Sequence, residues 1–299
     1  MSGKNVALVL SSGGARGLAH IGVINALKKE GFNITSVAGT SIGALIGAYY
    51  AAGHLDKYTE WVSDLDKMDI FKLFDFTFST QGFIKGEKVF KVLEEMIPDM
   101  NIEDMPIPFA AVATDARNKE EVIFTSGSMY TAIRASASVP TVLKPLYIND
   151  RELIDGGVLN PLPIDRVSRT SNDILVVVNV NSKNGYMPPT QTKQEENRYL
   201  KLINSFFDRW SNLLPGQGAI EKKLGFFDIL NRSLELMQDK ISEAAIQKAR
   251  PDLRIDISKD ACSTFEFYRT KEMIKAGETA FYQAYESTNL FTHDDPATQ

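Results

Sequence analysis

The chain has 299 residues, of which 43% are hydrophobic and 24% are charged, so we expect one large globular domain, alone or with a helical appendage. Its net charge of −5 gives no electrostatic reason to expect nucleic acid as a partner. The single cysteine excludes an internal disulfide, and no apolar run approaches the ~20 residues that span a bilayer. These features predict a soluble protein of the cytoplasm.

The first predicted strand is the apolar run at residues 6–10, which is typical of a strand buried in a parallel sheet. It leads into Ser-Ser-Gly-Gly-Ala-Arg-Gly (11–17), and a helix is expected from about residue 18. Such a glycine-rich loop can direct its N–H groups at a phosphate or an oxyanion. A Walker loop would end in Gly-Lys-Ser/Thr, and a dinucleotide fingerprint would have glycine in place of Ser12. An oxyanion hole is the third alternative.

The second predicted strand, at residues 34–38, precedes Gly-Thr-Ser-Ile-Gly (39–43) and a helix over residues 44–52. Strand, Gly-x-Ser-x-Gly and helix form the pattern of a nucleophile elbow, in which Gly39 and Gly43 permit a sharp turn that presents Ser41. The alternative is a glycine-rich turn whose serine caps the helix. An oxyanion hole at residues 11–17 that serves Ser41 is the only interpretation that uses both glycine-rich loops.

The middle of the chain, residues 56–105, is predicted to be mostly helical, with Trp61, Leu65 and Met68 at a spacing typical of a core. The aromatic segment 71–78 is predicted to pack as a connection, with part of an acyl channel as the alternative. Strands are expected at residues 108–113 and 121–125, a helix at 128–138, and two short strands at 146–148 and 152–154 around the turn at Asn149 and Asp150.

Asp155 follows the last short strand and precedes Gly156 and Gly157. The sequence fits a simple turn, and it also fits a base that another backbone segment approaches closely, since neither following residue has a side chain. A final strong strand is expected at residues 174–180. Strands that alternate with helices predict a layered α/β fold with a largely parallel sheet, with both glycine loops and Asp155 at the carboxyl ends of its strands.

Beyond this core of residues 1–180, we predict a polar linker and helical insert at 181–249, a returning strand and closing helix at 250–290, and a tail at 291–299. The insert would contain helices at 198–214 and 219–249, and the closing helix would cover residues 264–284. The helices at 199–249 fit a lid, the surface of a homodimer, or a face that contacts a membrane peripherally.

A hydrolytic serine needs a proton acceptor, and the three histidines of the chain are poorly placed for this role. His20 lies inside the first helix, His54 lies ~20 Å along a helix from Ser41, and His293 lies in the tail. A Ser–Asp dyad is the simpler hypothesis. Asp155 would accept the Ser41 proton directly, which requires that burial raise its affinity for protons.

Three motifs in this order, at residues 11–17, 39–43 and 155–157, resemble those of the patatin-like phospholipase family. The resemblance extends to residues 18–23, 113–115, 135–140 and 160–163, and it covers about residues 5–180 well. It resumes weakly at residues 250–253 and covers the insert at 181–249 poorly.

The resemblance implies a layered α/β/α fold and a serine lipid acyl hydrolase without cofactor or metal, in which Ser41 is the nucleophile and Asp155 the general base. The oxyanion hole would consist of the N–H groups of Gly13 and Gly14, assisted by the charge of Arg16. The other motif glycines, which shape the turns, would be Gly17, Gly39, Gly43, Gly156 and Gly157.

The chain departs from the family pattern at Ser12, where the family usually has glycine. A serine still supplies an N–H group to the hole, unless this position needs a positive φ.

The leading hypothesis for the function is hydrolysis of carboxylic esters of lipids, as in a phospholipase A, a lysophospholipase or an esterase. An acyltransferase or thioesterase would use the same acyl-serine with a different acceptor or substrate. A regulatory scaffold that keeps the fold without catalysis is the third hypothesis.

Overall fold

The computed structural model describes residues 4–73, 87–140, 142–183 and 226–288. The chain divides into two compact units, a larger unit of Met1–Gly185 with Gln238–Gln299 and a smaller unit of Tyr186–Met237. The predicted helix at 198–214 and the predicted tail lie outside the described residues, as do most of the linker at 181–197 and most of the aromatic segment at 71–78. The predicted domain boundaries therefore stay predictions.

Within the described residues, the larger unit is built on an eight-stranded mixed sheet, in agreement with the predicted α/β fold. Five strands run parallel in the order β3, β2, β1, β7, β8, and β8, the predicted returning strand, forms an edge. The strands are β1 (Asn5–Leu10), β2 (Asn33–Thr40), β3 (Phe109–Asp115), β4 (Glu120–Phe124), β5 (Leu146–Ile148), β6 (Arg151–Asp155), β7 (Ile174–Ser182) and β8 (Leu253–Ser258).

Strand β3 joins the parallel strands to an antiparallel group. Residues 111–115 of β3 pair with β4 along one edge. Along the other edge, residues 109–112 pair with β2 and residues 113–115 pair with β6. Because a strand has only two edges, β2 and β6 share one edge of β3, and their carboxyl ends meet there. This arrangement brings residues 40 and 155 to neighbouring positions of the sheet.

The helices follow the expected order along the chain. The first four are α1 (Ala19–Lys29), α2 (Ile42–Ala51), α3 (Leu55–Asp64) and α4 (Lys67–Leu73), and the later ones are α5 (Glu87–Met96), α6 (Met129–Ser136), α8 (Phe226–Ala249) and α9 (Thr270–Ser287). Short 3₁₀ helices are η1 (Gly14–Leu18), η2 (Ile102–Asp104), η3 (Gly156–Val158), η4 (Ile164–Arg166) and η5 (Phe267–Arg269).

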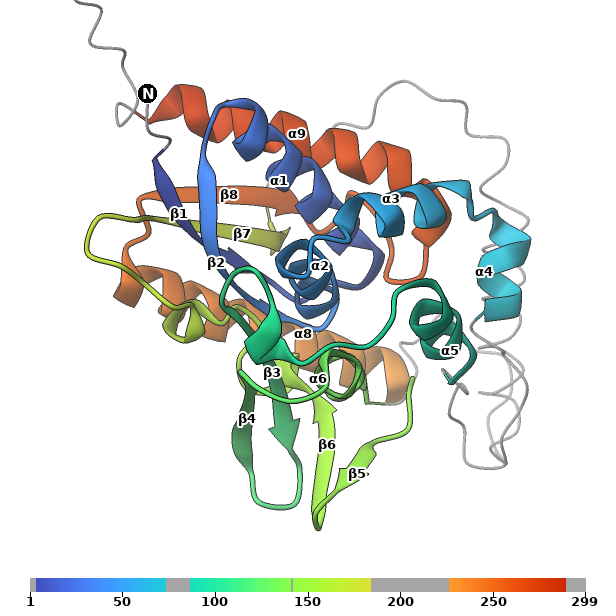
Figure 1. The fold of residues 1–299 in the computed structure, drawn as a ribbon. Helices are drawn as coiled ribbons and strands as arrows, with labels where there is room; N and C mark the ends of the chain where they lie inside the picture. Colours follow the sequence, from blue (N-terminus) through green and yellow to red (C-terminus); the bar gives the residue numbers. More distant parts are fainter. Residues whose placement is uncertain (1–3, 74–86, 141, 184–225, 289–299) are drawn as a thin grey trace, which may run out of the picture. The chain divides into compact units, whose positions relative to one another are not determined.

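Helices cover both faces of the parallel strands. Alternate side chains such as Val9 and Val177 pack with Ile246 from the C-terminal part of α8, and α1, α2 and α9 cover the other face (Figure 1). Helices α1 and α9 lie side by side because Gly277 has no side chain, since a Cβ there would lie 1.9 Å from the Ala19 carbonyl oxygen. Every residue of β1 after the first is buried, as expected for a strand covered on both sides.

Two details of the prediction were wrong. The stripe of Trp61, Leu65 and Met68 is not a continuous core face, because α3 ends before Leu65 and Met68 is 59% exposed, whereas Val62 is buried. The closing helix begins at Thr270 rather than residue 264, because a turn and η5 occupy the residues before it.

No helix in the described ranges combines the length and the apolar composition that a membrane span requires.

Candidate active site

Ser41 occupies a sharp turn between β2 and α2, as the elbow pattern predicts. Its backbone has φ 57° and ψ −121°, an unfavourable conformation for a residue with a Cβ atom. Neighbouring groups hold the turn: Ser136 Oγ accepts a hydrogen bond from Ser41 N–H at 2.8 Å and donates one to the Val112 carbonyl at 2.6 Å. The hydroxyl of Thr40 donates to the Asn160 carbonyl at 2.8 Å. Hydrogen bonds with α6 and with the segment after η3 therefore hold the backbone of this turn in its strained conformation.

The elbow packs directly on the glycine-rich loop of residues 11–17. A Cβ on Gly43 would lie 2.3 Å from the Leu10 carbonyl oxygen, so only glycine lets the first turn of α2 approach the end of β1. A Cβ on Gly17 would lie 2.2 Å from a side-chain methyl of Ile42. Gly39 supports the turn itself, since a Cβ there would lie 2.3 Å from the Gly43 carbonyl oxygen. The two predicted glycine loops therefore form one structural unit.

Asp155 ends β6 and lies in a buried position. Its Oδ1 accepts a hydrogen bond from Gly157 N–H at 2.7 Å, whereas Oδ2 is buried and has no hydrogen-bond partner among the described residues. Burial raises the pKa of this carboxyl from 3.8 to about 6, although the Ser41 hydroxyl and the Gly157 N–H act in the opposite direction. The carboxyl of Asp155 therefore holds a proton more tightly than an exposed aspartate does.

The two glycines after Asp155 complete the junction of the three motifs. A Cβ on Gly156 would lie 2.1 Å from the Val112 carbonyl oxygen and 3.1 Å from the Thr40 methyl group, which shows how closely this turn approaches the elbow. A Cβ on Gly157 would lie 2.9 Å from Asp155 Oδ1 and 3.3 Å from Ser12 Oγ. The Asp155 turn therefore touches both the elbow and the glycine loop.

In the glycine loop, the N–H groups of the residues just before and just after the two central glycines donate hydrogen bonds to backbone carbonyls. Ser12 N–H donates to the Pro161 carbonyl and Ala15 N–H to the Thr264 carbonyl, both at 2.9 Å. The hydrogen bonds found between described residues leave the N–H groups of Gly13 and Gly14 unused. Gly14 needs its glycine because φ is +57° and a Cβ would lie 2.7 Å from the Thr264 carbonyl oxygen.

Ser12 is not among the non-glycine residues with positive φ in the described part of the chain. The residue before the two central glycines therefore needs no glycine for backbone reasons. Its N–H already donates to Pro161, so this group is directed at the protein rather than at a ligand.

Arg16 connects the loop to two other segments. Its Nη1 donates to the Cys262 carbonyl at 3.1 Å, and its Nη2 donates to Asn181 Oδ1 at 2.9 Å. The side chain of Asn181 also donates to the Ser12 carbonyl at 2.7 Å. These contacts tie the loop to the end of β7 and to the segment after β8.

The two histidines in the described ranges do not contact Ser41 or Asp155. His20 is fully buried, and its Nε2 donates to the Ser11 carbonyl at 2.9 Å. Burial lowers the pKa of His20 to about 4, so the ring is neutral at neutral pH and supports the loop. His54 precedes α3, and His293 lies outside the described residues.

Sequence patterns alone did not identify three residues of the site. Ser136 lies within the motif at 135–140, so the resemblance to the family was the available signal. Asn181 and Gln238, whose Nε2 donates to the Gly157 carbonyl at 3.0 Å, have no local signal because they reach the site only through the fold.

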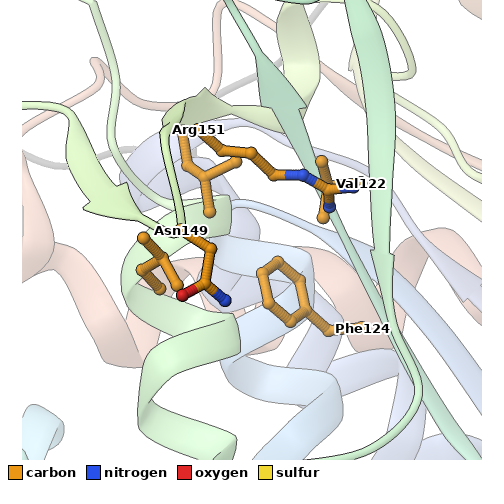
Figure 2. A pocket seen from close by; sticks show the side chains of 6 residues that line it. Val122, Phe124, Asn149 and Arg151 are labelled. Carbon is orange, nitrogen blue, oxygen red and sulfur yellow. The ribbon is translucent and has the colours of Figure 1, made fainter.

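A cavity of about 440 Å³ lies away from this junction, on the antiparallel strands (Figure 2). Arg151 extends across it toward Val122, and Asn149 and Phe124 lie on opposite sides. Its lining does not include Ser41 or Asp155. Within the described ranges, no group of three or more His, Cys, Asp or Glu side chains is arranged to hold a metal ion.

Several known proteins are similar to this chain. The model of the patatin-like phospholipase family matches residues 8–167. NTE family proteins of Mycobacterium bovis and Mycobacterium tuberculosis are 31% identical over 97% of this chain and 93% of their own length. A lysophospholipase of Kluyveromyces lactis is 28% identical over 93% of this chain, which corresponds to 19% of that protein. The solved structure of VipD from Legionella pneumophila aligns with a TM-score of 0.47 and 15% identity, over 96% of this chain and 67% of VipD.

Proposed function

The chain belongs to the patatin-like phospholipase family, and we propose that it is a serine lipid acyl hydrolase with a dyad of Ser41 and Asp155. Family membership and the lysophospholipase relatives support lipid acyl hydrolysis in general. The observation that most directly supports the dyad is that β2 and β6 both pair with the same edge of β3, where their carboxyl ends meet. Thr40 pairs with Val112 there, and Asp155 pairs with the next residue of β3.

In the proposed first step, Ser41 Oγ attacks the ester carbonyl carbon and its proton passes to Asp155 Oδ2. This oxygen is the suitable acceptor, because Oδ1 already accepts the Gly157 N–H while Oδ2 has no partner among the described residues. Burial raises the pKa of the carboxyl to about 6, which makes it a stronger base than an exposed aspartate and still leaves it ionised at pH 7. The proton then passes to the leaving alkoxide, and an acyl-serine remains.

The N–H groups of Gly13 and Gly14 would stabilise the oxyanion, since these are the loop donors that no described group uses. One such donor is typically worth ~10²–10³ in rate. Arg16 would act through the shape of the loop, because Nη1 and Nη2 donate to Cys262 and Asn181. In the second step, Asp155 removes a proton from water, the water attacks the acyl-serine, and a fatty acid leaves while Ser41 regains its proton.

We propose an amphiphilic lipid ester as the substrate and a lysophospholipid as the first to test, because fungal relatives are named lysophospholipases. Acyl transfer or thioester cleavage would proceed through the same acyl-serine, so a preferred acceptor other than water would favour a transferase. We also propose peripheral contact with a membrane and a homodimer.

The decisive test compares wild type with Ser41→Ala and Asp155→Asn on p-nitrophenyl acyl esters and on a lysophospholipid. Each variant should lower kcat at least ~10³-fold, because a nucleophile and its base act as a unit. A fluorophosphonate probe should label Ser41 in wild type. Ser36→Ala is the matched control, since Ser36 is a buried serine of the same strand far from the turn. A folded wild type that neither turns over nor labels would support the scaffold hypothesis.

A further inference from the structure

The side chain of Asn181 holds the glycine loop at two points. Asn181 is the second-last residue of β7. It lies outside residues 8–167, which the family model matches. Its Nδ2 donates to the Ser12 carbonyl at 2.7 Å, and its Oδ1 accepts from Arg16 Nη2 at 2.9 Å. The two contacts flank Gly13 and Gly14, whose N–H groups form the proposed oxyanion hole.

The orientation of the Asn181 amide follows from its partners. An arginine N–H must meet the amide oxygen, and a carbonyl oxygen must meet the NH₂ group, so only one of the two amide orientations satisfies both contacts. The backbone of Asn181 is also fixed, because its N–H donates to Asn179 Oδ1 at 3.1 Å. The backbone that carries the Asn181 amide is therefore held in place near the end of β7.

The contact with Ser12 determines the direction of the Gly13 N–H. The carbonyl of Ser12 and the N–H of Gly13 belong to the same peptide group, which is planar, and the described chain contains no cis peptide. In a trans peptide the C=O and the N–H point in opposite directions. A donor that fixes the Ser12 carbonyl on one side therefore fixes the Gly13 N–H on the other. A hydrogen bond to the carbonyl also polarises the peptide and strengthens its N–H as a donor.

The loop would not keep this orientation through backbone preference alone. Gly13 has an extended φ of 163° and Gly14 has a φ of +57°, and glycine adopts many other conformations at little cost. On the β7 side, a Cβ on Gly13 would lie 2.3 Å from a methyl group of Val180 and 3.4 Å from Asn181 Oδ1. The end of β7 thus forms the surface against which the flexible peptide is held.

We propose that Asn181 is a positioning residue that orients the Gly13 N–H toward the developing oxyanion. This inference rests on the proposed acyl hydrolase function. It adds to the site a residue outside the part of the chain that the family model matches. Asn181 acts through the Ser12–Gly13 peptide group and touches neither the ester nor Ser41.

The test compares Asn181→Asp and Asn181→Ala with wild type. Aspartate has the same shape and keeps an acceptor for Arg16, but as a carboxylate it has no N–H for the Ser12 carbonyl. Alanine removes both contacts. Asn33→Asp is the matched control, because the Asn33 amide donates to Asn5 at 2.9 Å at the opposite end of the sheet. The activity is expressed per Ser41 titrated to completion with the fluorophosphonate, so that unfolded protein does not affect kcat.

We expect both Asn181 variants to lower kcat by about 10–100-fold, which is less than the ~10²–10³ for loss of an oxyanion donor. KM should change less than threefold, and Asn33→Asp should match wild type. If Asn181→Asp keeps kcat within twofold of wild type, the Ser12 contact does not orient the donor and the inference is wrong. If wild type itself has no activity and no labelled Ser41, the proposed function fails instead, so the two failures are distinguishable.

Discussion

At the scale of single residues, the environment of Asp155 decides whether a dyad without histidine is chemically reasonable. The carboxyl is 5% exposed, and no charged side chain among the described residues contributes to its pKa shift. Burial therefore has the largest effect, and it disfavours the ionised form. A general base works best when its pKa lies near the working pH, so this shift is in the useful direction.

The first prediction concerns the pH dependence of catalysis. In the proposed mechanism the carboxylate form of Asp155 is the base, so kcat/KM should rise with pH, with a slope of one, and level off above a midpoint near 6. The measurement is the rate for a p-nitrophenyl ester from pH 4.5 to 8, with the Ser41→Ala rate subtracted as background. A profile that is flat down to pH 4.5 would contradict the assignment of Asp155 as the base.

At the scale of elements, α6 supports the elbow through one hydroxyl group. Ser136 lies in the last turn of α6, and its Oγ both accepts from Ser41 N–H and donates to the β3 carbonyl of Val112. All three groups are buried, so removal of this hydroxyl leaves two backbone groups without their partner. The hydrogen bonds hold Ser41 in a conformation that its own backbone disfavours.

The second prediction is that Ser136→Ala lowers both the stability and kcat. Two backbone groups lose a partner, so the free energy of unfolding should fall by about 1–3 kcal/mol. The kcat per titrated Ser41 should also fall, because the elbow relaxes. Ser128→Ala is the matched control: Ser128 caps the other end of α6 by accepting from Thr131 N–H. That variant should cost ~1 kcal/mol and leave kcat per titrated site unchanged. An equal effect of both variants on kcat would contradict the role of Ser136.

At the scale of the whole molecule, the burial of Asp155 changes the stability of the fold. The native pKa of about 6 lies above the usual value of 3.8, so the native state binds this proton more tightly than the unfolded chain does. The resulting stabilisation is complete below about pH 4 and is lost as the pH rises through about 6. At neutral pH the protein therefore carries a buried charge that weakens the fold.

The third prediction follows from this linkage. Asp155→Asn should be more stable than wild type at pH 7.5 by at most ~3 kcal/mol, and the difference should shrink toward pH 4. Chemical denaturation at both pH values measures it. Asp115→Asn is the control of opposite sign: burial raises the Asp115 pKa, but hydrogen bonds from Asn118 and Arg117 outweigh it and the net shift is downward. That variant should lose stability at neutral pH. A destabilised Asp155→Asn at pH 7.5 would contradict the raised pKa.

The sequence by itself determined the local parts of this protein. Periodic apolar residues located most strands and helices, and the glycines at 39, 43, 156 and 157 marked the turns where backbones approach closely, because only glycine fits such contacts. These signals lie within a few residues of one another, so they need no knowledge of the fold. They also identified Ser41 and Asp155 as candidates before their environment was known.

Only the tertiary structure decided how these parts meet. Alternating strands and helices did not reveal that β6 runs antiparallel on the β2 edge of β3, since strand pairing depends on residues far apart in the chain. That pairing brings Asp155 to the elbow, and the burial it produces raises the pKa of Asp155. Asn181 and Ser136 carry no local signal for their contacts, because a hydrogen bond across the fold exists only when the fold has formed.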